Sequence, residues 1–219
     1  MPSGFWDGVQ NEPDCMLIGT NRALCIIAVQ GVRFDAMCIR DRYTQLWLDQ
    51  KLGWQYHHDF WMPFVGWKVG PAHARVAHCD EFVRLDGPWK HEREIDRSRE
   101  YAVMANHSVV LMAANWAWLQ GVRDIALVGV DYGPGPDGAL HAAMIPPWGI
   151  APRRGQDVYK SQIPECTVLE CRNAAAAVAA AGGRVVNVSP GTRLKAVPTG
   201  DAMEWLDEQT TAALRGKEQ

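Results

Sequence analysis

The second half of the chain repeats one arrangement twice: a helical stretch, a glycine, and a short apolar strand followed by polar residues. In the first copy, an apolar helix over 109–120 ends at Gly121, and a fully apolar strand covers 125–130. In the second, an alanine-rich helix over 169–181 ends at two glycines, and a strand over 184–188 follows. Such alternation is typical of parallel strands joined by crossover helices, because parallel neighbours need a long connection.

The rest of the chain carries weaker signals of the same kind. Further elements are expected as strands over 15–19, 34–39 and 81–85, and as helices running to about residue 29, over 43–52 and over 201–214. Between residues 53 and 94, aromatic residues, histidines, glycines and prolines interleave, which indicates an irregular, aromatic-rich insertion. We therefore expect one α/β domain over 1–219, a Rossmann-like three-layer sandwich with a mostly parallel sheet.

Composition narrows the class of protein. At 219 residues, 47% apolar and 21% charged, the chain suits a single globular domain, and its formal charge of −3 argues against nucleic acid as a partner. It has no signal peptide and no apolar run of membrane-spanning length, and its six cysteines form no C-x-x-C pair. We expect a cytoplasmic protein without a zinc site; its oligomeric state stays open.

Polar side chains follow the expected strands at their carboxyl ends, where open parallel sheets bind ligands. Asparagine, serine and arginine near helix amino-termini suit phosphate or hydroxyl recognition, although the chain has neither a P-loop nor a G-x-G-x-x-G motif. The candidate binding residues are Gly19, Asn21, Arg22, Asp41, Asn106, Ser108, Tyr132, Asn187 and Ser189. We expect these polar ends to meet along a single rim that holds a small phosphorylated ligand.

Two further residues are candidates for catalysis. Asp131, at the end of the apolar strand, suits a metal ion or a ribose hydroxyl, and it equally suits a helix or turn cap. His141 follows a loop rich in glycine and proline, and an imidazole that titrates near neutrality is a natural general base. The alternative for His141 is a solvated loop histidine. The adjacent pair His57-His58 is a poor chelate, because neighbouring side chains point apart, so we expect no metal site there.

Several segments resemble a known group of proteins. Four short segments carry the resemblance. They are Asn106-His107-Ser108 before an apolar helix, the Gly-Val-Asp-Tyr strand end at 129–132, the Asn-Val-Ser-Pro turn at 187–190, and Ile-Gly-Thr-Asn-Arg at 18–22. The group shares one Rossmann-like domain and includes the bacterial family 42 sialyltransferases, the archaeal 6-hydroxymethylpterin diphosphokinase-like proteins and many uncharacterised phage proteins. The resemblance covers most of the chain outside residues 53–94.

The resemblance implies a nucleotide-binding site. In the transferases of this group, asparagine and serine side chains hold a nucleotide-sugar donor, tyrosines contact its phosphate and a histidine acts as base. The positions that match these roles here are Asn21, Ser108, Asp131, Tyr132, His141, Asn187 and Ser189.

Three functions remain open. The first is a glycosyltransferase-like enzyme that moves a sugar from a nucleotide donor, its substrate, to a hydroxyl acceptor, with His141 as base. The second is a diphosphokinase acting on a hydroxymethyl group of a pterin-like substrate; it alone needs Mg²⁺, held by Asp131 and Asp41. The third is a non-catalytic phage accessory protein. The group opens with a strand and a glycine-rich loop ending in Pro-Ser, whereas this chain has only Met1-Pro2-Ser3-Gly4, which favours the third.

Overall fold

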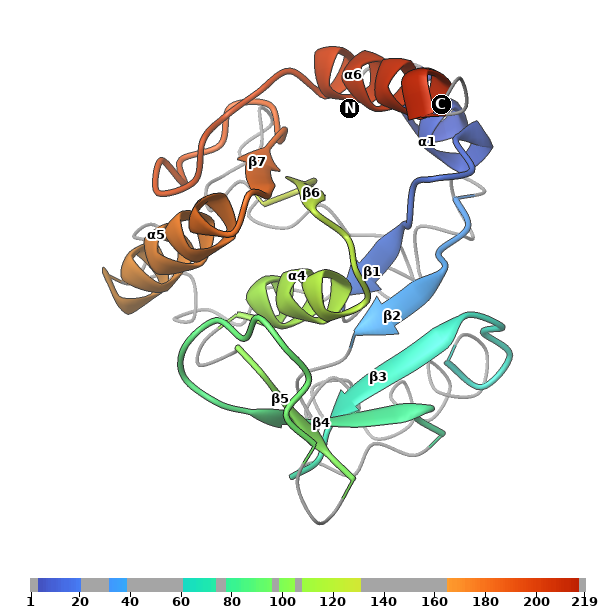
Figure 1. The fold of residues 1–219 in the computed structure, drawn as a ribbon. Helices are drawn as coiled ribbons and strands as arrows, with labels where there is room; N and C mark the ends of the chain where they lie inside the picture. The colour runs from blue at the N-terminus through green and yellow to red at the C-terminus, as the bar shows by residue number, and fades with distance from the viewer. Residues whose placement is uncertain are drawn as a thin grey trace, which may run out of the picture. The chain divides into compact units, whose positions relative to one another are not determined.

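A computed structural model describes residues 4–20, 32–38, 61–73, 78–95, 99–104, 108–130 and 165–216. The chain divides into two compact units, which we treat separately. We call Ile18–Val122 with Ala143–Ala151 the central unit, and Met1–Leu17, Arg123–Ala142 and Pro152–Gln219 the terminal unit. From residue 101 onward, strands and helices alternate along the chain (Figure 1), and together with the parallel strands described below this places it in the α/β class.

The central unit is built on a five-stranded sheet in which all neighbouring strands are parallel. Its strands lie side by side in chain order: β1 (Ile18–Thr20), β2 (Ala36–Cys38), β3 (Trp67–Pro71), β4 (Glu81–Leu85) and β5 (Tyr101–Val103). Parallel strands in chain order require a crossover connection after each strand. The expectation of an α/β, Rossmann-like fold with a mostly parallel sheet is therefore confirmed.

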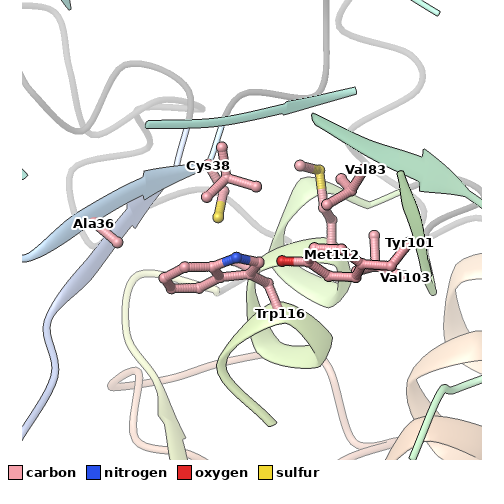
Figure 2. Packing of buried hydrophobic residues seen from close by; sticks show 9 residues of the cluster. Ala36, Cys38, Val83, Tyr101, Val103, Met112 and Trp116 are labelled. Carbon is pink, nitrogen blue, oxygen red and sulfur yellow. The ribbon is translucent and has the colours of Figure 1, made fainter. Parts of the chain in front are cut away.

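One face of this sheet forms the core of the central unit with helix α4 (Val109–Leu119). Residues paired across parallel strands point to the same face, and the pairing of Cys38 with Val69 puts both on the face that α4 covers. Met112 and Trp116 of α4 pack against this face (Figure 2). The helix contacts β1, β2 and β5, so it reaches from one edge strand of the sheet to the other. Because α4 is apolar on nearly all sides, it is buried along most of its length.

Both helices that precede a strand in the second half end in the same way. Gly121 has a φ of 103°, and Gly182 has a φ of 78°, a left-handed conformation that glycine adopts without a Cβ clash. After α4, the Gly121 N–H donates to the Trp118 carbonyl at 2.9 Å, and the Val122 N–H donates to the Ala117 carbonyl at 3.1 Å. The glycines predicted as helix ends therefore close their helices and turn the chain towards the next strand.

The described residues of the terminal unit form a two-stranded parallel sheet and three helices. Its elements are α1 (Phe5–Asn11), β6 (Asp124–Leu127), α5 (Glu165–Ala180), β7 (Arg184–Asn187) and α6 (Ala202–Gly216). Helix α1 packs on α6, and Phe5 and Val9 are buried with Val186, Val188 and Leu206. The contact is close, since a Cβ on Gly8 would lie 2.4 Å from the Leu206 side chain.

Most of the predicted elements that fall on described residues are confirmed. The strand over 81–85 matches β4 at both ends, and the apolar helix matches α4. The sequence patterns missed α1, β3 and β5, and β3 lies in the middle of the central sheet, inside the segment expected to be irregular. The helices expected before residue 29 and over 43–52 lie outside the described residues. Among the described helices, none has the length and apolar character needed to cross a bilayer.

Candidate functional site

The candidate site residues divide between the two units. Gly19 and Ser108 lie in the central unit, and Asn187 and Ser189 lie in the terminal unit. The other candidates lie outside the described residues: Asn21, Arg22, Asp41, Asn106, Asp131, Tyr132 and His141. The expected single rim, and the roles of Asp131 and His141, therefore stay predictions.

Ser108 occupies the N-cap position of α4. Its backbone is extended, with φ −133° and ψ 123°, and its carbonyl accepts the Met112 N–H at 3.2 Å as the first bond of the helix. The amide hydrogens of the first turn have no carbonyl partner within the helix. The Ser108 hydroxyl makes no cap bond to them, although the residue is only 6% exposed. Within the described part of the chain, the hydroxyl and these amides are therefore left without a partner.

The start of α4 lies where parallel sheets commonly bind ligands. The helix follows β5, so its first turn comes after the carboxyl end of a strand. No acidic side chain lies in that turn, so nothing there repels an anion. Gly19 is buried on β1, at the opposite edge of the sheet from β5, where it pairs with Met37. Helix α4 contacts both edge strands.

A fully buried asparagine midway along α4 holds two of the loops that pack on this helix. Asn115 Oδ1 accepts the Met104 N–H at 2.6 Å and the Lys90 N–H at 3.1 Å, and its Nδ2 donates to the Lys90 carbonyl at 2.8 Å. Met104 directly follows β5, and Lys90 lies in the loop after β4. The sequence analysis missed Asn115, although a single amide inside an otherwise apolar helix was a visible signal.

Asn187 and Ser189 form a closed polar network in the terminal unit. The Asn187 amide nitrogen donates to the Val130 carbonyl at 2.9 Å and to Thr192 Oγ1 at 3.0 Å, while its oxygen accepts the Ser189 N–H at 3.0 Å. Ser189 Oγ accepts the Val130 N–H at 2.8 Å, and Thr192 Oγ1 donates to the Val130 carbonyl at 2.8 Å. All three side chains are buried. They hold the main chain at Val130, the last described residue before Asp131.

A second polar cluster, which the sequence analysis also missed, surrounds Glu81 in the central unit. Glu81 Oε2 accepts hydrogen bonds from Trp116 Nε1 at 2.7 Å and from the Tyr101 hydroxyl. Arg93 lies 3.7 Å from Glu81 Oε1, and its guanidinium carbon lies 4.6 Å from the centre of the Tyr101 ring. Burial, followed by the hydrogen bond to Glu81, raises the pKa of Tyr101, so the hydroxyl stays protonated and donates. These contacts join α4 to β4 and β5.

Four of the described cysteines are poor nucleophiles. Burial raises the pKa of Cys15 and of Cys171 to about 11 and that of Cys79 to about 12, and it raises the pKa of Cys38 further. These groups are therefore thiols, not thiolates, at neutral pH. Within the described ranges, no three histidine, cysteine or acidic side chains are placed to hold a metal ion.

The start of α4 is thus the described place with the clearest capacity for a ligand. It offers amide donors and a hydroxyl that form no hydrogen bond with one another or with other described residues, whereas Asn187 and Ser189 are bonded to the chain itself. Comparison with known proteins gives no match: no protein family, no curated protein and no solved structure matches this chain.

Proposed function

We propose that this chain binds a small phosphorylated ligand, a nucleotide, with one phosphate group at the start of α4. The observation that carries this proposal is the uncapped first turn of α4: the Ser108 hydroxyl stands beside its free amides and makes no cap bond to them, and the Ser108 residue is only 6% exposed. A ligand oxygen at this position can accept hydrogen bonds from these amides and from the hydroxyl.

The electrostatics of the helix support an anion at this position. Aligned peptide dipoles give a helix amino-terminus a partial positive charge, and its free N–H groups point out along the axis. In α4 neither an acidic residue in the first turn nor a capping side chain competes for these donors. The helix follows a strand of an all-parallel sheet, the position at which such folds bind phosphate groups.

The reaction that we assign to this ligand is transfer of a sugar from a nucleotide donor to a hydroxyl acceptor. His141 serves as the general base that deprotonates the acceptor, and Asp131 and Tyr132 contact the donor, as the resemblance to the transferase group implies. The network of Asn187, Ser189 and Thr192 supports this assignment indirectly, because it fixes the main chain immediately before Asp131.

Calorimetric titration of the full chain tests the binding step. Pyrophosphate, nucleoside diphosphates and nucleotide sugars are titrated with and without Mg²⁺. Ser108→Ala should weaken binding by about tenfold or more, because it removes one hydrogen bond to a charged oxygen. Thr211→Ala, which alters an exposed hydroxyl on α6, is the matched control and should bind as the original chain does.

Further outcomes separate the competing functions. Binding of a nucleotide sugar without metal, followed by slow donor hydrolysis that His141→Ala abolishes, supports glycosyl transfer. Binding of ATP that requires Mg²⁺ instead supports the diphosphokinase. If none of these ligands binds to the original chain, the proposal fails, and a protein that keeps the fold without the ligand becomes the better description.

A further inference from the structure

The connection from β4 to β5 forms no helix in residues 87–95 (Figure 1), although crossovers between parallel strands are usually helical. We call these residues the strap. Trp89 is 7% exposed, but the other residues of the strap are half-buried or exposed, and the run from His91 to Ile95 is exposed throughout. The strap therefore lacks the continuous apolar face that fixes an ordinary crossover helix on its sheet.

The first attachment of the strap to α4 is aromatic, and it carries a cost. The ring centroids of Trp89 and His91 lie 6.1 and 6.0 Å from that of Trp118, in the last turn of α4. Trp89 Nε1 is buried and has no hydrogen-bond acceptor among the described residues. A buried donor without an acceptor costs stability, and water would bond it once the ring is exposed. The closed strap therefore pays a cost that an open strap does not.

The second attachment can be lost while its anchor stays in place. Asn115 Oδ1 accepts the Lys90 N–H at 3.1 Å and the Met104 N–H at 2.6 Å, and Asn115 Nδ2 donates to the Lys90 carbonyl at 2.8 Å. When Lys90 leaves, Met104 still bonds Asn115 Oδ1, and water can replace the main chain of Lys90. The exchange of a hydrogen bond within the chain for one to water has a small net cost.

The third attachment consists of weak contacts at the sheet. Arg93 lies 3.7 Å from Glu81 Oε1, which is beyond hydrogen-bond range, and the Arg93 side chain is 34% exposed. Its guanidinium carbon lies 4.6 Å from the centre of the Tyr101 ring, and Ile95, which is 65% exposed, forms an isolated antiparallel bridge with Tyr101. Because water reaches these contacts, they hold this end of the strap only loosely.

We infer that the strap opens and closes as one unit over the C-terminal half of α4, while Met104 keeps Asn115 in place. In the closed state Trp89 packs on the Trp118 ring, and in the open state both rings are uncovered. Opening therefore exposes an aromatic surface that the closed chain hides. The inference is independent of the proposed ligand, because none of the contacts that carry it involves the first turn of α4.

Hydrogen exchange of the full chain, measured by NMR for single amides and without any ligand, tests the inference. The Lys90 and Met104 N–H groups bond the same oxygen atom, so a permanently closed strap would protect both to a similar extent. If the strap opens, the protection factor of the Lys90 amide should be about tenfold or more below that of the Met104 amide. Equal protection of the two amides, or stronger protection of Lys90, overturns the inference.

Arg93→Met tests whether the strap moves as one unit. The substitution removes the contact with Glu81 at one end of the strap, so it should speed exchange of the Lys90 amide several-fold if the attachments open together. Arg172→Met, at an exposed arginine of α5, controls for the loss of one positive charge. If Arg93→Met exchanges at Lys90 like Arg172→Met, or speeds exchange of the α4 amides equally, the strap is no separate unit and the inference is overturned.

Discussion

Helices α4 and α6 begin at polar residues that sequence rules favour as helix caps, yet the two starts use them differently. At α6, Asp201 Oδ1 accepts the Met203 N–H at 2.8 Å and the Glu204 N–H at 3.1 Å. At α4, the Ser108 hydroxyl makes no such bond. A capping residue type therefore predicts where a helix starts, but it does not predict whether the free amides are used. Amides that the chain satisfies add stability, and amides left open can bind a ligand.

The same contrast separates the candidate binding residues. The Asn187 side chain uses its amide nitrogen and its oxygen in hydrogen bonds within the chain, so it links the ends of β6 and β7. The Ser108 hydroxyl, in contrast, makes no cap bond to the helix that it precedes. Substitutions can test this comparison, because loss of a satisfied group should lower stability, whereas loss of an open group should lower only ligand affinity.

The largest expected effect is that of Asn187→Ala. It leaves the Val130 carbonyl and the Ser189 N–H without their Asn187 partner inside a fully buried network, so the free energy of unfolding should fall by about 3 kcal/mol. Urea unfolding followed by circular dichroism measures the change. Asn173→Ala, at an exposed asparagine of α5, is the control and should leave the midpoint nearly unchanged. Equal midpoints for both variants would show that the network carries no stability.

The fold was predictable wherever local pattern and tertiary packing agree. Helix α4 was predicted because it is apolar except at Asn115, and strand β4 because Phe82, Val83 and Leu85 fall within one short segment. Strand β3 was missed because Lys68, Gly70 and Pro71 interrupt its pattern; β2 and β4, which pair with it on either side, stabilise it. Helix α1 was missed because it is short and contains Gly8, and its burial against α6 depends on residues almost the whole chain away.

The sequence predicted which polar residues lie at strand ends and helix starts, but not which of them are already hydrogen-bonded to the chain. Sequence placed Asn187 and Ser108 correctly, at a strand end and at a helix start. It could not reveal that the Asn187 amide is already used, because its partner Val130 lies 57 residues earlier in the chain. Asn115 and Lys90 were overlooked for the same reason, since only the folded chain brings the loop after β4 against α4.

The next effect in size is that of Asp201→Ala. Loss of a helix cap typically costs about 1 kcal/mol, and Asp201 makes two cap bonds, so the urea midpoint should fall measurably but less than in Asn187→Ala. Asp207→Ala removes an exposed acidic residue of the same helix without removing a cap, and it serves as the control. If both variants lose the same stability, charge near the helix start, not capping, explains the effect.

The hydrogen-bonded carboxylate of Asp124 should make the stability of the fold depend on pH. Its carboxylate accepts hydrogen bonds from Arg184, from Trp205 Nε1 at 3.0 Å and from Gln209 Nε2 at 3.0 Å. Burial raises the pKa of Asp124, but these hydrogen bonds outweigh burial and lower it below its usual value. A carboxylate with a lowered pKa in the folded state stabilises the fold above its unfolded pKa of about 4, and this stability is lost as the pH falls through the folded pKa.

Urea midpoints measured from pH 7 down to about pH 2 should therefore decline on the acid side in the original chain. Asp124→Asn should flatten that decline and should have a smaller effect at neutral pH than Asp201→Ala, because the cluster is partly exposed to water. Asp207→Asn controls for the loss of an exposed carboxylate. An unchanged acid slope in Asp124→Asn would mean that other carboxylates govern the acid sensitivity.

The smallest expected effect on stability, and the one on which the comparison turns, is that of Ser108→Ala. Because the hydroxyl caps no amide, the free energy of unfolding should change by less than about 0.5 kcal/mol, well below the cost of Asp201→Ala. Urea unfolding of the two variants side by side measures the difference. If Ser108→Ala instead lost as much stability as Asp201→Ala, the hydroxyl would cap the helix in solution. The start of α4 would then be closed like that of α6, and the proposed phosphate site would lose the donors on which it depends.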